Sequence, residues 1–450
     1  MQGQDEKLVL PDDVLAAILS RLAPRSLATS RCVCIAWRDL IDARRLLPDD
    51  LLPCSLQGLF INYVAPEYNF AEFLSRPLAK SVNYPPYMCV RDHCNGLLLL
   101  DDGVQNPVTG RRTPFPDCPS PGTGMKYFIQ EKYLVFDPTV SSHYEVFSIP
   151  RVPYKEYPDD DPGGIKIYGR HAEERIGRAL LRSSWPLSPC VLNVFSSRTG
   201  SWHKRFFDRD GEAAGSVADM QLDERYWMRR RNSVYCHGAL YVHCENDYIM
   251  RISLSANKYR MVKPPRVTCD NLEFNLGKSG KDVYYALLDD DDLLRVWILA
   301  EPSACGELEW ILKHDSGCSL FLPSLNCVPK AQGPWNLHDV TSGKGGESGA
   351  VQKEHKYEWN SDDESILHNE DSGPSRCCDG YLEILGFHPY KEIIFMHWST
   401  RRVLAYHLNS SKLEDLGHLR PNNMTVDDIG TTFPFTPCLI AGELSEQNNN

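Results

Sequence analysis

The chain has 450 residues, of which 42% are hydrophobic and 24% are charged, and its formal net charge is −12. These proportions are ordinary for a globular protein and exclude disorder over most of the length. The acidic excess provides no basic field that would attract phosphates, so we expect no nucleic acid partner.

The N-terminus lacks the features of a secretory signal. Its first residues, MQGQDEKLVLPDD, do not place basic residues before an apolar run, and no apolar run approaches the ~20 residues that span a bilayer. We therefore expect no membrane partner and a location in the cytoplasm or the nucleus. In such a reducing compartment the 16 cysteines are expected to remain thiols, and no CxxC pair occurs among them.

Residues 8–47 form the first predicted unit, a set of three short helices. Asp12 or Asp13 can cap the first helix, and Pro24 ends it or opens the second. The apolar positions of the first and third helices follow the 3.6-residue period: Val14, Leu15, Ile18, Leu19 and Leu22, and then Val33, Ala36, Trp37, Leu40 and Ile41.

This helical segment is too short to be stable by itself in the usual way. Domains below about 40 residues generally need disulfides, a metal or a partner. Cys32 and Cys34 lack companions with the spacing of zinc ligands, so we expect no metal here. The helices either pack on the rest of the chain or complete their core with a second protein, and periodicity alone leaves both open.

Residues 10–38, LPDDVLAAILSRLAPRSLATSRCVCIAWR, resemble the F-box motif in its plant form almost position for position. The resemblance implies docking onto an SKP-type adaptor, which in turn holds a cullin–RING ubiquitin ligase. Carried over by position, the implied adaptor-binding residues are Leu10 and Pro11 in the adaptor groove, Leu15, Ile18, Leu19 and Leu27 in the interface, and Val33 and Trp37 ordering the third helix.

After residue 47 the pattern changes to short apolar runs separated by Gly, Pro, Asn, Asp and Ser, which is typical of an all-β domain. An apolar strand runs into a polar turn, and an aromatic or apolar residue opens the returning strand, mostly at intervals of about fifty residues. The aligned residues are Tyr144, Trp202, Tyr259, Trp310 and Leu413, with LLLLDDGVQNPVTGRRTPF at 97–115 as a looser first copy.

Residues 55–445 are therefore predicted to form a β-propeller with six blades, or seven as the alternative, and the whole chain to be an α+β multidomain protein. LFINY at 59–63 would begin one blade, and FPFTPCLIAGEL at 433–444 would close it. Residues 330–376 are rich in Gly, Ser, Asp and Glu, so we expect a disordered insertion there.

A second resemblance covers most of this β region. The segments CNGLLLL at 94–100, NPVTG at 106–110, HGALYVHC at 237–244 and PFTPCLI at 434–440 look like the plant F-box-associated, kelch-like domain. That domain implies a propeller that binds a substrate protein and carries out no reaction itself.

Two groups of potential metal ligands lie in the β region, and neither is expected to bind a metal. Cys236, His237, His243 and Cys244 flank a turn on strands whose neighbouring side chains point to opposite faces. Residues 289–292 are four aspartates without the spaced ligands of a calcium loop. No hydrolase, phosphate-binding or dinucleotide motif appears, so we expect no catalytic residue and no cofactor.

Together these patterns predict the substrate-recognition subunit of an SKP–cullin–F-box ubiquitin ligase complex. Such a subunit bridges the SKP-type adaptor and a target protein for ubiquitination, and it is not itself an enzyme. Two alternatives stay open. The protein could bind the adaptor and sequester its partner without degradation, or it could be a glycan-binding or catalytic propeller with an incidental helical start.

Overall fold

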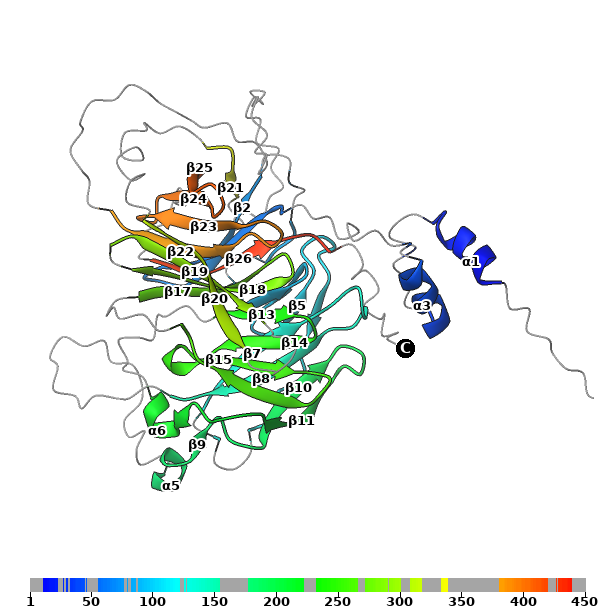
Figure 1. The fold of residues 1–450 in the computed structure, drawn as a ribbon, viewed down its shortest axis with the longest axis horizontal. Helices are drawn as coiled ribbons and strands as arrows, with labels where there is room; N and C mark the ends of the chain where they lie inside the picture. Colours follow the sequence, from blue (N-terminus) through cyan, green and yellow to red (C-terminus); the bar gives the residue numbers. More distant parts are fainter. Residues whose placement is uncertain are drawn as a thin grey trace, which may run out of the picture.

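The computed structural model shows a mostly β body and a separate pair of helices at the N-terminal end (Figure 1). It describes residues 11–22, 27, 30, 33–44, 46, 56–76, 79, 82–85, 88–121, 125–126, 128–153, 177–221, 232–265, 272–289, 291–300, 308–317, 333–338, 380–419, 426 and 428–438. The two N-terminal helices are α1 (Asp12–Leu19) and α3 (Ile35–Ala43). This arrangement agrees with the predicted order of helices followed by strands.

Most described strands belong to six units of four antiparallel strands, which we number in order of their first strand. Unit 1 contains β1 (Gly58–Val64), β2 (Phe70–Ser75), β21 (Asn336–His338) and β26 (Asp428–Phe435). Unit 2 contains β3 (Asp92–Cys94), β4 (Leu97–Leu99), β5 (Gly103–Gln105) and β6 (Arg112–Pro114). Unit 3 contains β7 (Ile129–Val135), β8 (Glu145–Arg151), β10 (Cys190–Ser196) and β11 (Ser201–Arg209).

The remaining three units follow the same plan. Unit 4 contains β13 (Ser233–Cys236), β14 (Ala239–His243), β15 (Ile249–Ser253) and β16 (Lys258–Val262). Unit 5 contains β17 (Leu272–Ser279), β18 (Asp282–Asp289), β19 (Leu293–Ala300) and β20 (Glu309–Gly317). Unit 6 contains β22 (Leu382–Phe387), β23 (Ile393–Trp398), β24 (Arg402–His407) and β25 (Lys412–His418). Units 3 and 4 are also joined by a two-residue parallel pairing of β11 with β16.

Four of the five aligned repeat residues occupy one structural position. Trp202, Tyr259, Trp310 and Leu413 are each the second residue of the fourth strand of their unit. Tyr144 differs, because it directly precedes β8, the second strand of unit 3, which also contains Trp202. The predicted step from Tyr144 to Trp202 is therefore wrong as a step between units, since the strand–turn–aromatic pattern occurs at two hairpins of unit 3.

Unit 1 brings together the two ends of the β region. β26 pairs with β1 in an antiparallel register that places Leu59 opposite Pro434 and Phe60 opposite Phe433. This pairing confirms the predicted role of the C-terminal strand. Pro434 has no N–H to donate, and β26 is an end strand of its sheet, where proline is tolerated.

One end strand of unit 1, β21, comes from within the predicted disordered insertion. Leu337 lies opposite Leu74 on β2, and the preceding Trp335 is buried in the cluster between units 1 and 6. The prediction of a disordered loop at 330–376 is therefore wrong for residues 333–338. A short apolar segment can complete a sheet edge even when its surroundings are polar. The other residues of 330–376 lie outside the described part of the chain.

Hydrophobic clusters between successive units complete a circle. They join units 1 and 2, 2 and 3, 3 and 4, 4 and 5, 5 and 6, and 6 and 1. In the last of these, Tyr63 of β1 packs in one cluster with Phe395 of β23. Each unit thus buries apolar side chains on both faces, which is why inner strands such as β1, β23 and β24 carry apolar residues at most positions, whereas the fourth strands β11, β20 and β25 are more polar and more exposed.

A smaller group of elements packs beside unit 3. It contains α5 (Arg178–Leu181), β9 (Ser184–Trp185), β12 (Gly215–Ser216) and α6 (Val217–Met220). The 3₁₀ helix η2 (Glu245–Asp247), which follows β14, contacts α6 through a hydrogen bond from Asn246 to the Asp219 carbonyl. Trp185 is buried here and stacks on Phe128, with ring centroids 5.3 Å apart. The stack fixes residues 184–189 next to the end of the unit 3 sheet.

The first strands of units 2, 3 and 4 meet at the carboxylate of Asp92 on β3. Its Oδ2 accepts hydrogen bonds from the Leu134 N–H on β7 (2.7 Å) and from the Ser233 hydroxyl on β13 (2.9 Å). Loss of water on burial disfavours the charged form and raises the pKa of Asp92 to about 7 in spite of these hydrogen bonds.

Asp92 is expected to lower the stability of the protein as the pH rises from about 4 to about 7. In this window the unfolded chain ionises its aspartate while the folded protein keeps Asp92 protonated, so the free energy of unfolding falls by up to about 4 kcal/mol. We expect Asp92→Asn to remove this contribution. Thermal unfolding midpoints between about pH 5 and about pH 8 should fall more for the unaltered protein than for Asp92→Asn; equal falls would contradict the role of Asp92.

Candidate protein-docking surface

Local backbone contacts define where α1 begins and ends. The Pro11 carbonyl accepts hydrogen bonds from the N–H groups of Val14 and Leu15, both at 3.0 Å. Asp12 and Asp13 occupy the first turn, where negative charge is favourable against the helix dipole. The helix ends at Ser20, whose N–H donates to the Ala16 carbonyl at 2.9 Å.

One side of α1 packs into a small core made by the N-terminal residues alone. The buried members are Ala16, Leu19, Leu27, Leu40 and Ile41, and the partly buried side chains of Leu15, Leu22, Trp37 and Leu46 pack around them. Leu19 is only 1% exposed. Neither of the two expected arrangements accounts for this core, because side chains of α1, of α3 and of Leu27, which lies between these helices, bury one another.

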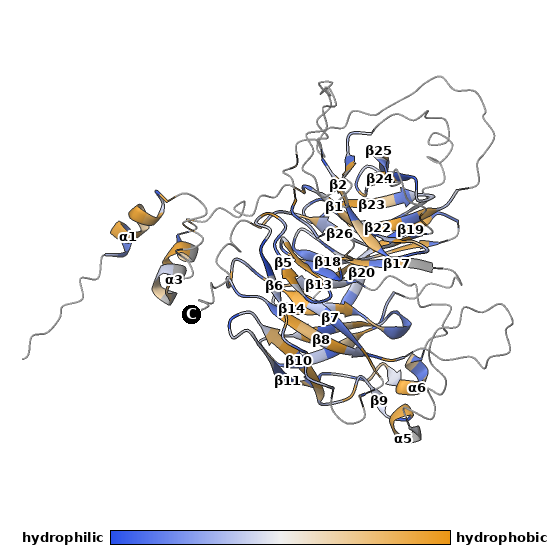
Figure 2. Cartoon of the chain, turned by 180° about the vertical axis from the view of Figure 1, so that it is seen from behind, coloured by the Kyte–Doolittle hydropathy of each residue, from blue (hydrophilic) through white to orange (hydrophobic). Residues whose placement is uncertain are grey.

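The opposite side of α1 is apolar and exposed to solvent. Val14 is 45% exposed and Ile18 is 48% exposed, and Pro11 lies one turn before Val14. Residues three and four apart lie on the same face of a helix, so these side chains form a continuous row. We call Pro11, Val14 and Ile18 the apolar row. Single exposed apolar residues are common, but a contiguous row marks an interaction surface. Figure 2 shows hydrophobic colouring over much of α1.

The structure divides the predicted adaptor-binding residues into three groups. Pro11, Ile18 and Val33 are exposed. Leu15 and Trp37 are partly buried against the helical core, whereas Leu19 and Leu27 are fully inside it. Leu10 lies outside the described residues. In the structure of the chain alone, Leu19 and Leu27 pack within the helical module, while the adaptor-binding role of these residues stays a prediction.

Two side chains differ from their predicted roles. Val33 was expected to order the third helix by packing, but it precedes α3 and is 63% exposed. Val14 was not among the predicted binding residues, although it is part of the apolar row. Its position three residues after Pro11 and four before Ile18 was the sequence signal for it.

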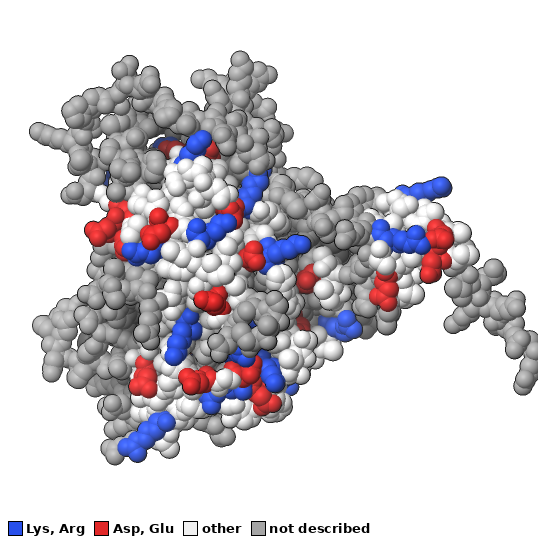
Figure 3. Space-filling view, in the orientation of Figure 1, with Lys and Arg blue, Asp and Glu red and all other residues white. Residues whose placement is uncertain are grey.

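On the face of the molecule that Figure 3 shows, charged side chains of both signs are interspersed over the described parts of the helices and of the β body. Arg44, just after α3, forms an ion pair with Asp13 in the first turn of α1. Both side chains are largely exposed, so the pair contributes less than about 1 kcal/mol to stability.

The two groups of potential metal ligands form ordinary turns. β13 and β14 are joined by a tight turn at His237 and Gly238, both with positive φ, so Cys236 and His237 lie at one end of β14 and His243 and Cys244 at the other. In the aspartate run, the Asp289 carboxylate accepts hydrogen bonds from the N–H groups of Asp291 and Leu293 and closes the hairpin. In the part of the chain that the structure describes, no group of three His, Cys, Asp or Glu residues is arranged to hold a metal ion.

Among the described residues, none of the helices has the length and apolar character needed to cross a bilayer.

The N-terminal helices therefore define a small helical module with its own core and a second apolar side. Residues 8–49 match the F-box domain, and F-box domains bind SKP-type adaptors within cullin–RING ligases. This match supports the prediction of an F-box protein. No curated protein matches the sequence.

Two solved structures that resemble this chain are distant likenesses. AztD of Citrobacter koseri is 10% identical, with 84% of this chain and 97% of that chain covered and a TM-score of 0.29. The SREBP–SCAP binding domains of fission yeast are 9% identical, with 64% and 80% covered and a TM-score of 0.21. Because both TM-scores are low, the fold follows from strand pairing and packing alone.

Substitutions at neighbouring positions should separate the two sides of α1. Leu19→Ala leaves a cavity in the helical core and is expected to cost about 2–5 kcal/mol, whereas Ile18→Ala on the exposed side should change stability by less than about 0.5 kcal/mol. Limited trypsin digestion of the full-length protein should therefore cleave at Arg21 faster in Leu19→Ala, and at an unchanged rate in Ile18→Ala. Equal rates for both variants would show that α1 does not have these two sides.

Proposed function

We propose that this protein is the substrate-recognition subunit of an SKP–cullin–F-box ubiquitin ligase, and that it joins an SKP-type adaptor to a target protein for ubiquitination. The observation that carries the proposal is the apolar row on α1, which lies within the segment that matches the F-box domain. The β body supplies a separate surface for a target.

The apolar row has the character of a helix that docks in a groove. Such helices present anchors at i, i+3, i+4 and i+7, and Pro11, Val14 and Ile18 occupy the first, second and last of these positions, with the partly buried Leu15 at the third. Leu15 also touches the helical core, so it would connect the two apolar sides. The helical core fixes the direction of α1 before the adaptor binds, which lowers the entropy cost of docking.

The β body is proposed to be a six-bladed, kelch-like propeller of the kind associated with plant F-box proteins, with each unit as one blade. Its support is the circle of six hydrophobic clusters and the pairing of β1 with β26, which places both ends of the β region in one unit. A closed ring of this kind is stiff and leaves loops free to contact a partner.

In this proposal the protein works by placement and forms no covalent bond itself. The helical module would hold the ligase while the β body holds the target, and this raises the effective concentration of target lysines near the ubiquitin carrier. F-box proteins generally have this non-catalytic role. We place the activity in the cytoplasm or the nucleus.

Replacing the apolar row with charges should abolish adaptor binding. In the variant with Val14→Asp and Ile18→Asp, two apolar side chains that the adaptor would bury become carboxylates, which would have no partner in an apolar groove. Loss of one hot-spot side chain typically costs ~2 kcal/mol or more, so affinity should fall by at least about a hundredfold. The measurement is co-purification and titration of the full-length protein with a purified SKP-type adaptor.

Val140→Asp is the matched control. Val140 is also an exposed valine, but it lies in the turn between β7 and β8. This variant should bind the adaptor normally. The proposal would be wrong if the unaltered protein failed to bind the adaptor, or if the doubly substituted α1 bound it as well as the control does.

A further inference from the structure

Neighbouring units of the β body differ in strand length. The strands of unit 2 have three residues each, whereas those of unit 3 have seven or nine. Unit 2 covers one part of the unit 3 sheet, where Leu134, Val146 and Phe195 of unit 3 pack in the hydrophobic cluster between units 2 and 3. Because the sheet of unit 3 is longer than its cover, its far end extends past unit 2.

Strand register shows which side chains occupy this uncovered end. Ser148 lies opposite both Lys132 and Asn193, and Asn193 lies opposite Lys204, so these residues form one row across unit 3. They share a face with Val146 and Phe195, because side chains alternate along a strand. In the next row Val191 lies opposite Phe206, and these two are 43% and 60% exposed.

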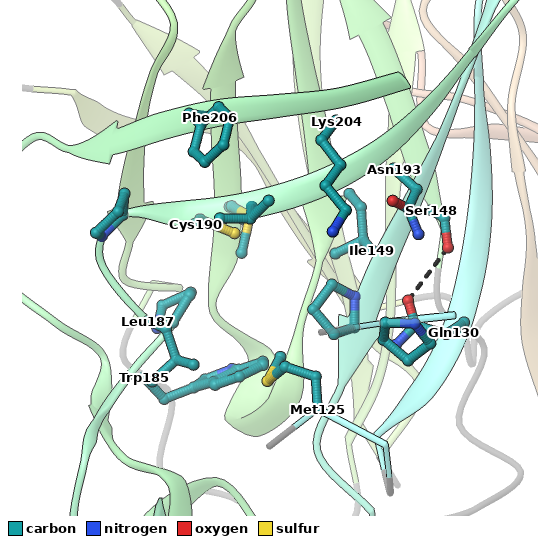
Figure 4. Close-up of a pocket in the computed structure, with 16 residues that line it drawn as sticks. Met125, Gln130, Ser148, Ile149, Trp185, Leu187, Cys190, Asn193, Lys204 and Phe206 are labelled. Carbon is teal, nitrogen blue, oxygen red and sulfur yellow. Dashed lines mark hydrogen bonds between the residues drawn. The ribbon is translucent and has the colours of Figure 1, made fainter. Parts of the chain in front are cut away.

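Loops from outside the sheet turn this end into a pocket of about 340 Å³. Met125, Trp185 and Leu187 form an apolar wall, and Figure 4 shows them across the cavity from Lys204 and Phe206 of β11. Trp185 is held by its stack on Phe128. The volume is within the range of sites that bind small ligands or single side chains.

The floor of the pocket carries polar groups. Ser148 is buried and donates a hydrogen bond to Oε1 of Gln130 at 3.2 Å. Asn193, which also lines the pocket, donates from Nδ2 to the Pro119 carbonyl at 2.9 Å. These groups can accept or donate hydrogen bonds to a bound backbone.

The charge of the pocket is positive. Among the described residues that line it, Lys204 is the one charged side chain, and it has no ion-pair partner in the described part of the chain. Burial raises the pKa of the Cys190 thiol to about 12, so Cys190 adds no negative charge. In a chain with a net charge of −12, an apolar pocket with a single cation selects for a negatively charged ligand.

We propose that this pocket is where the target protein docks, and that it receives an extended peptide segment with a large apolar side chain next to an Asp or Glu. This inference rests on the proposed function as a substrate receptor. The apolar side chain would pack between Trp185 and Phe206, and the carboxylate would pair with Lys204. A peptide fits better than a small molecule because Val191 and Phe206, which line the cavity, are 43% and 60% exposed and carry its apolar lining out to the surface of the sheet.

A display library of short random peptides, selected on the full-length protein, tests this site. We expect enrichment of peptides in which Phe, Leu, Met or Trp adjoins Asp or Glu. Synthetic versions of the enriched peptides should bind at least about tenfold more weakly to Lys204→Glu and to Phe206→Ser. Selection on Lys204→Glu should in turn favour Lys or Arg at the acidic position.

Two control variants carry a lysine-to-glutamate change and an apolar-to-serine change at exposed positions outside the pocket. Lys281→Glu alters an exposed lysine in the turn before β18, and Ile311→Ser alters an exposed apolar residue of β20. Both should bind the enriched peptides like the unaltered protein. The site is overturned if no apolar–acidic motif is enriched, if small carboxylic acids bind but peptides do not, or if Lys204→Glu and Phe206→Ser bind the peptides as well as the controls.

Adaptor binding, measured on the same variants, distinguishes the failure of this site from failure of the proposed function. If Lys204→Glu and Phe206→Ser bind the SKP-type adaptor normally while peptide selection fails, the receptor function stands and the pocket is wrong. If peptide binding follows the expected pattern but the unaltered protein does not bind the adaptor, the pocket stands and the ligase role is wrong.

Discussion

The proposed function depends on one helix, α1, which has only eight residues but carries apolar side chains on two sides. The chain itself covers one side of α1, with Leu27, Leu40 and Ile41, and leaves the other in water. Covering both sides within the chain would stabilise the module but would remove the exposed side that we propose docks the adaptor. Covering neither would leave too little buried surface for the helices to hold a defined direction. The observed compromise gives a preformed module with an unsatisfied side.

The β body solves the opposite problem, since its sheets leave almost no apolar face uncovered. Six clusters close a circle, and β26 returns to β1 so that the ring is held by main-chain hydrogen bonds as well as by packing. One exception is the far end of unit 3, which extends past the short strands of unit 2. There the exposed side chains of Val191 and Phe206 lie in one pocket with Lys204, and this combination suits a selective peptide site.

Much of this organisation could be predicted from residue patterns, and the failures have physical reasons. Helical periodicity identified the apolar residues of α1, and the resemblance to the F-box motif assigned Leu19 and Leu27 to the interface. Neither pattern shows which apolar side chains the chain itself covers, and the structure places both leucines in the helical core. Strand β21 was missed because three residues in a polar stretch carry no periodic signal. The pocket could not be predicted, since it arises from a difference in strand length between two units and from loops that no motif connects.

The central claim is that a second protein completes the uncovered side of α1. Amide hydrogen exchange over residues 11–46 of the full-length protein, with and without a purified SKP-type adaptor, tests it most directly. The account predicts that the adaptor slows exchange in α1 and α3 and leaves the strands of units 3 to 6 unchanged. Exchange in α1 that is the same with and without a saturating amount of adaptor would contradict it.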